Sequence, residues 1–136
     1  MNETSERGSL TAFLAVLALG LFVLVGLVVD GGRALVARRQ AVDVAEQAAR
    51  VGADQLSVDA LRSGQFVVDP ASAASAVTNY LEATGATGTV SVTGNSVTVH
   101  IVHNTPTTVL GMIGIGDIPV SATAAATNLH GVTRGD

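Results

Sequence analysis

An apolar segment near the N-terminus constrains this chain more than any other feature of its sequence. No charged residue occurs between Gly8 and Val29, and residues 10–29 read LTAFLAVLALGLFVLVGLVV. Helical residues rise about 1.5 Å each, so a segment of this length gives roughly 30 Å, the thickness of a bilayer's hydrocarbon core. We therefore predict a transmembrane helix over residues 10–29, surrounded by membrane lipid and preceded by a short tail at residues 1–9.

A cleaved secretory signal is the main alternative interpretation of this segment. Such signals have an apolar core of about 7–15 residues, followed by a cleavage site of small-x-small pattern. The apolar core here is longer, and the residues that follow it, Asp30-Gly31-Gly32-Arg33, fit a cleavage site poorly. The sequence therefore favours an uncleaved, single-pass anchor.

The arginines on either side of the span bear on its orientation. Arg7 lies on the N-terminal side, whereas Arg33, Arg38, Arg39 and Arg50 lie on the C-terminal side. Cytoplasmic flanks carry an excess of basic residues. Taken alone, this count places the C-terminal part of the chain in the cytoplasm.

A stripe of small side chains follows the span. Residues 30–56 are predicted to continue the helix outside the membrane, because the sequence from Arg33 to Leu56 has no proline and is rich in helix formers. Six small residues recur there every three or four positions, which places them on one face of a helix. They are Ala34, Ala37, Ala41, Ala45, Ala48 and Gly52. This face either packs against other subunits or packs on the chain's own sheet, and one helix can do both.

Residues 70–128 are predicted to form a small module after a linker at residues 57–69, with a C-terminal tail at 129–136. Asp69 as N-cap and Pro70 at the first helical position open a short helix, which Gly85 ends. The apolar residues of that helix share one face. They are Ala73, Val77, Tyr80 and Leu81.

Three strands follow this helix. Thr89–Thr93 and Ser96–Asn104 alternate apolar and polar residues around a Gly94-Asn95 turn, a pattern typical of a β-hairpin. A helical turn is expected over Thr107–Met112, and Ile118–Asn128 reads as a third strand. The predicted fold is α+β: a long N-terminal helix, transmembrane and continuing outside the bilayer, packed on a small three-stranded antiparallel sheet with one further short helix.

The chain offers little material for catalysis or metal binding. It has no cysteine, and its seven basic residues face eleven acidic ones without a basic patch. His100 and His103 would point to opposite faces of a strand, and a zinc site needs three or four convergent ligands. No catalytic constellation or phosphate-binding loop is present in the sequence. We therefore expect no enzyme activity, no cofactor, no metal site and no nucleic-acid partner.

Several segments together resemble a known family. They are Glu6–Ser9, Gly26–Arg33 (GLVVDGGR), Ala37–Ala49 (ARRQAVDVAEQAA) and Pro119–Ala124 (PVSATA). These segments resemble the TadE/TadG-like, pseudopilin-like proteins of the tight-adherence (Flp) pilus system. The resemblance implies a minor pilin-like component, non-enzymatic, whose partners are other single-span pilus or secretion subunits or further copies of the same chain.

The resemblance also implies a topology and a candidate processing position. It places the N-terminus in the cytoplasm and the C-terminal module outside the cell membrane, against the arginine count. In members cut by the prepilin peptidase, cleavage follows a glycine, and the fifth residue after the cut is acidic. Gly8 and Ser9 match the cut, but the fifth position is Phe13, so we expect residues 1–8 to be retained.

A membrane-tethered extracytoplasmic binding or sensing module is the alternative function. Such a module needs a pocket with convergent polar or aromatic groups. The sequence provides few aromatic side chains for one, namely Phe13, Phe22, Phe66 and Tyr80.

Overall fold

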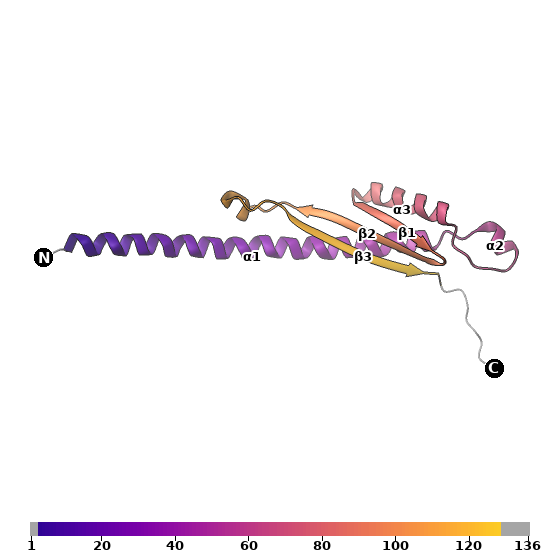
Figure 1. Cartoon of the computed structure of the whole chain (residues 1–136), viewed down its shortest axis with the longest axis horizontal. Helices are drawn as coiled ribbons and strands as arrows, with labels where there is room; N and C mark the ends of the chain where they lie inside the picture. The colour runs from indigo at the N-terminus through magenta and orange to yellow at the C-terminus, as the bar shows by residue number, and fades with distance from the viewer. Residues whose placement is uncertain (1–2, 129–136) are drawn as a thin grey trace, which may run out of the picture. The chain divides into compact units, whose positions relative to one another are not determined.

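The structure is a computed structural model that describes residues 3–128, with side chains described from residue 9 onward. The tail predicted at residues 129–136 lies outside the described residues. The elements, in chain order, are α1 (Glu3–Ala53), α2 (Val58–Arg62), α3 (Pro70–Thr84), β1 (Thr87–Thr93), β2 (Ser96–Thr105), the 3-10 helix η1 (Leu110–Ile113) and β3 (Ile118–Thr127) (Figure 1).

The described residues fall into two compact units. The first unit contains the chain up to Leu35 together with Thr105–Ile118, and the second contains Val36–Asn104 and the chain from Pro119 onward. Helix α1 begins at Glu3, inside the segment predicted as a tail, and runs without a break through both parts of the sequence. Its continuation past the apolar segment agrees with the prediction from the sequence.

The three strands form one sheet in the order β1-β2-β3, and this confirms the predicted α+β class with an antiparallel sheet. Strands β1 and β2 pair so that Val90 lies opposite Val99 and Val92 opposite Val97. The turn between them contains Gly94 with φ of 58°, a left-handed conformation that glycine adopts without steric cost. The Gly94-Asn95 hairpin predicted from the sequence is therefore present.

One face of the sheet carries the core of the second unit. The buried side chains come from the end of α1, from α3 and from alternate positions of β2 and β3, and the alternation follows the period of a strand. The core residues are Ala41, Ala45, Ala48, Ala49, Ala53, Val68, Ala73, Val77, Leu81, Val97, Val99, Ile101 and Ala122. The helices thus form one layer and the sheet a second layer.

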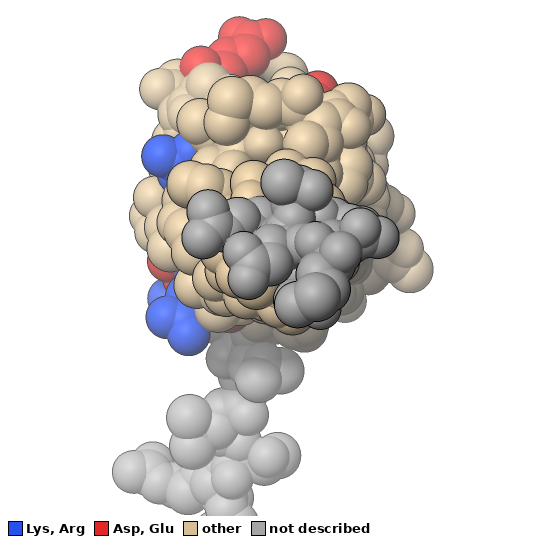
Figure 2. Space-filling model, turned by 90° about the vertical axis from the view of Figure 1, so that its left-hand side faces the viewer, with Lys and Arg blue, Asp and Glu red and all other residues tan. Residues whose placement is uncertain are grey.

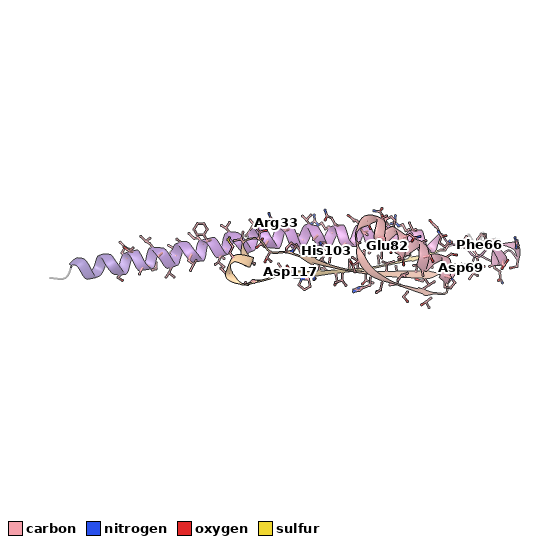
Figure 3. All side chains as sticks on the ribbon, turned by 90° about the horizontal axis from the view of Figure 1, so that it is seen from above. Arg33, Phe66, Asp69, Glu82, His103 and Asp117 are labelled. Atoms are coloured by element: carbon pink, nitrogen blue, oxygen red, sulfur yellow. The ribbon has the colours of Figure 1, made fainter. Side chains whose placement is uncertain are left out.

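Helix α3 has the ends that the sequence predicted. The Asp69 side chain accepts hydrogen bonds from the backbone N–H groups of Ala71 and Ser72, and Gly85 ends the helix in a left-handed conformation. Asp69 and Glu82 are labelled near the two ends of α3 in Figure 3. Hydrogen bonds from the Ser72 hydroxyl and from the Ser72 and Ala71 backbone hold the pKa of the Asp69 carboxyl below its ordinary value.

The segment predicted as a linker contains a short helix. Ser57 caps α2 by accepting a hydrogen bond from the Ala60 backbone, and Leu56 pairs with Val68 in an isolated bridge. This bridge explains why α1 ends at Ala53 and not at the predicted Leu56. Asn95 in the hairpin turn accepts a hydrogen bond from the Val68 N–H and donates one to the Phe66 carbonyl oxygen, so the turn holds this segment in place.

Acid should remove the contribution of the Asp69 cap to stability. The pKa of this carboxyl in the folded chain lies below its ordinary value of 3.8, so the cap contributes fully above pH 3.8. The contribution is lost as the pH falls through the folded pKa. Thermal unfolding of the chain and of Asp69→Asn, followed by circular dichroism from neutral to acidic pH, should show a difference in Tm that shrinks below that range. A difference that stays constant down to the lowest pH would contradict this account.

Gly52 lies where α1, α3 and β2 meet, and it should tolerate no side chain. A Cβ at position 52 would lie 2.8 Å from both Val77 Cγ2 and Val97 Cγ1, and branched valines have little freedom to move away. Gly52→Ala should therefore destabilise the fold by about 1–2 kcal/mol, although alanine favours a helix more than glycine does.

Gly32→Ala is the matched control for this substitution, because nothing lies within 4 Å of a Cβ built there. It should leave stability unchanged or raise it by up to about 1 kcal/mol. Chemical denaturation of the detergent-solubilised chain measures both variants. Equal stability of the two would show that the helix does not approach the valines as closely as described.

Candidate functional site

The apolar part of α1 exposes nearly all of its side chains. From Ser9 to Val29, every described residue except Gly26 is exposed. Helix α1 is long and apolar enough to cross a membrane. Exposed apolar surface of this extent is unfavourable in water, so the segment needs lipid or partner helices around it.

The loop between β2 and β3 packs against the end of the apolar segment. We call residues 105–118 the 105–118 loop; they comprise the last residue of β2, the connection that contains η1 and the first residue of β3. A Cβ at position 26 would lie 2.5 Å from Val109 Cγ1, so the loop reaches the helix backbone only because residue 26 is glycine. Leu110 is buried at the same contact.

The carboxylate of Asp30 holds this loop through its backbone. Oδ1 accepts a hydrogen bond from the Thr108 N–H at 3.1 Å, and Oδ2 accepts from Val109 and Leu110 at 3.0 and 2.8 Å. N–H groups at the start of a helix lack partners within the helix, so the carboxylate satisfies donors that would otherwise be unpaired. We call this arrangement the Asp30 clasp.

Arg33, one turn after Asp30, completes the clasp. Its guanidinium lies 3.9 Å from Asp30 Oδ1 and donates a hydrogen bond to the Thr108 hydroxyl. Asp30 is only 2% exposed, whereas most of the Arg33 side chain is exposed. Figure 3 labels Arg33 on α1 and Asp117 near the end of the 105–118 loop.

No role for Asp30 was predicted from the sequence. The available signal was an acid placed directly after twenty-two residues without charge, Gly8 to Val29. An acid at that boundary is unfavourable unless a partner satisfies it. The partner was not predictable from neighbouring residues, because it lies about eighty positions further along the chain.

The stripe of small residues is largely covered by the chain itself. Ala41, Ala45, Ala48 and Gly52 are buried in the core of the second unit, and Ala34 and Ala37 are half-buried. Of the two alternatives from the sequence, the structure shows the contact with the chain's own sheet. A role of the stripe in packing against other subunits stays a prediction, and its buried members are not accessible to a partner in this fold.

A comparison with protein families bears directly on α1. Residues 8–55 match the family model of the TadE/G-like Flp pilus-assembly domain. The match includes the apolar segment, Asp30, Arg33 and the whole stripe, and it ends close to the end of α1. Comparisons with curated proteins and with solved structures found no match. Residues 8–55, which include the N-terminal hydrophobic helix, are thus similar to the TadE/G-like Flp pilus-assembly family.

The remaining candidate residues have no contact with the Asp30 clasp. His100 and His103 are both exposed, and His100 Nδ1 lies 2.7 Å from the Thr123 hydroxyl oxygen. Within residues 3–128, no three acidic or histidine side chains come together as metal ligands. Gly8 and Ser9 lie inside α1, and the retention of residues 1–8 expected from the sequence stays a prediction.

Few charged side chains are visible on the described surface that faces the viewer in Figure 2. On the face drawn in Figure 2, the acidic and basic residues form small separate areas, and the rest of the described surface is neither acidic nor basic. From Leu10 to Val29, the exposed side chains of α1 are mainly apolar.

Removing the Asp30 carboxylate should release the 105–118 loop from the TadE/G-like helix. Asp30→Ala leaves the N–H groups of Thr108, Val109 and Leu110 without their acceptor, so their hydrogen exchange should become faster. Amide exchange of the detergent-solubilised chain, read by mass spectrometry of peptides from residues 105–118, measures this change.

Asp43→Ala is the matched control for the clasp, because Asp43 is an exposed acid on the same helix. It removes the same charge without touching the loop, and exchange in residues 105–118 should stay as in the unmodified chain. Unchanged protection in Asp30→Ala would show that the clasp does not hold the loop.

Proposed function

We propose that this chain is a membrane-anchored, minor pilin-like component of a Flp-type pilus or a related secretion assembly. The TadE/G-like match over residues 8–55 is the observation that carries the proposal. In this role α1 spans the cell membrane with the N-terminus in the cytoplasm, and the α+β module lies outside. The chain acts by packing its helix against other subunits, without catalysis.

The exposed surface of the apolar segment supports a role in helix packing. Large apolar side chains project on all sides of α1 from Leu10 to Val29. Lipid can cover these side chains, and so can the helices of other single-span subunits or of a second copy. Association of helices within a membrane depends on packing of this kind.

Burial of the stripe moves the expected subunit contact toward the N-terminus. Ala45 and Ala48 are fully buried, so a partner helix cannot reach them. Leu35 and Val36, directly after the Asp30 clasp, are each 54% exposed. We therefore place the contact with partner subunits on the exposed side of α1 from the apolar segment to about Val36.

Photo-crosslinking in cells that assemble the pilus tests this proposal. Benzoylphenylalanine, which keeps the phenylalanine ring and adds a benzoyl group, replaces Phe22, which is 72% exposed, and in a second variant replaces Leu35. Both positions should yield adducts with other single-span subunits or with further copies of the chain, identified by mass spectrometry.

The same probe at Asn79, an exposed position of α3, is the control. Helix packing predicts that adducts form at positions 22 and 35 and are much weaker at position 79. Protein adducts at position 79 alone would favour a tethered binding or sensing module and would defeat the proposal.

A further inference from the structure

We propose that the 105–118 loop inserts into the bilayer beside α1, so that lipid acyl chains contact the loop as well as the helix. The leaflet concerned is the one from which α1 emerges toward Asp30. This inference rests on the proposed span, because it uses the position of the membrane along α1. It adds a second membrane contact to a chain that has one predicted transmembrane helix.

The loop lies beside residues of the apolar segment and not only beside its end (Figure 1). One apolar depression is lined from both sides, by three residues of α1 and four of the loop. They are Leu19, Phe22, Val23, Val109, Leu110, Met112 and Ile113. Phe22 precedes Val29 by seven residues, which is roughly 10 Å along the helix. Helix η1 therefore lies beside the apolar segment at about that distance from its C-terminal end.

The apolar segment would be too short to span the hydrocarbon if the residues that contact the loop lay outside the bilayer. If the hydrocarbon ended at Leu19, only residues 9–18 would remain inside it. Ten helical residues rise roughly 15 Å, which is about half of the hydrocarbon thickness. A span of full thickness therefore extends past Phe22 and includes the depth at which η1 lies.

The composition of the loop fits an apolar environment. No charged residue occurs from Thr105 to Gly116, and Asp117 is the first acid after this stretch. Met112, Ile113 and Ile115 are 79, 54 and 49% exposed, although all three are strongly apolar. Side chains of this kind gain free energy when they move from water into hydrocarbon.

Insertion also requires that polar backbone groups find partners within the protein, and six N–H groups of the loop do so. The Asp30 clasp accepts from three consecutive N–H groups, at Thr108, Val109 and Leu110. Three further N–H groups donate to carbonyl oxygens of the loop itself, namely Met112 to Val109, Gly114 to Gly111 and Ile115 to Leu110.

The Thr107 hydroxyl adds to this internal pairing. It lies 2.6 Å from the Ile115 carbonyl oxygen and 2.7 Å from that of Gly116. The single hydroxyl hydrogen is donated to one of these two carbonyl oxygens at a time, so one of them has a partner without water. Internally paired N–H groups, an uncharged stretch from Thr105 to Gly116 and exposed apolar side chains occur together in this loop, and lipid acyl chains are the occupant that fits all three.

Fluorescence quenching in vesicles tests the inference on the full chain. The chain has no cysteine, so a single Ile113→Cys substitution places one environment-sensitive label on η1. The labelled chain is reconstituted into phosphatidylcholine vesicles. Lipids with a nitroxide on the acyl chain quench labels in hydrocarbon, and iodide on both sides of the vesicle quenches labels in water.

Two reference positions separate failure of the inference from failure of the span. Val16→Cys lies in the apolar segment away from the loop contact and is 71% exposed, whereas Asn79→Cys is exposed on α3. We expect nitroxide lipids to quench the labels at positions 16 and 113, and iodide to quench position 79 several-fold more than either. Met112→Cys repeats the measurement in case the label at position 113 disturbs the loop.

Each other outcome overturns the inference in a different way. Quenching of position 113 by iodide, with position 16 quenched by nitroxide lipid, leaves the span intact and removes the loop from the bilayer. Protection of position 113 from both quenchers shows that protein, such as a second copy, covers the loop. Absence of lipid quenching at position 16 means that the span itself fails.

Discussion

Small side chains on one face of α1 allow the helix and the sheet of the second unit to form a common core. Ala45 and Ala48 are fully buried, and Gly52 lies against Val77 and Val97 at a distance that excludes even a methyl group. The branched residues of β2 fill the space that these small residues leave. A sheet of three strands has too little buried surface to be stable without a covering layer. The extramembrane part of α1 therefore belongs to the core and is more than a connection to the anchor.

A second constraint operates at the other unit, where a buried carboxylate replaces close packing as the main contact. Asp30 follows the last residue of the apolar segment, and three backbone N–H groups satisfy it. Gly26, one turn earlier, gives the loop access to the helix. One acid and one glycine thus hold the 105–118 loop along the helix, and the chain has no cysteine that could add a disulfide. The TadE/G-like match covers the helix side of this contact only.

Local signals in the sequence were sufficient for most elements of the fold. Asp69-Pro70 and Gly85 mark the two ends of α3, Gly94-Asn95 marks the hairpin, and alternation marks β3. Helix α2 was missed because five residues are too short to show helical periodicity, and because Asn95 fixes its neighbourhood from the distant hairpin turn.

The candidate site was less predictable than the fold. The stripe was recognised, but its pattern is the same whether the small residues meet a partner helix or the chain's own sheet. Only the tertiary structure shows which of them, Ala41 to Gly52, are covered internally. The role of Asp30 depends on residues in another part of the sequence, and no local pattern around Asp30 or around Thr108 points to the other.

The separation of contacting residues along the chain affects when this protein can fold. Asp30 meets Leu110 across eighty residues, and the Asn128 side chain donates to the Ala53 carbonyl oxygen across seventy-five. A helix forms from neighbouring residues as it is synthesised, whereas contacts between distant residues wait for the whole intervening chain. On the proposed topology, α1 enters the membrane first, and its small-residue face stays uncovered until α3, β2 and β3 have been translocated. During that interval other proteins of the pilus assembly can contact the small-residue face, and the completed fold then covers it.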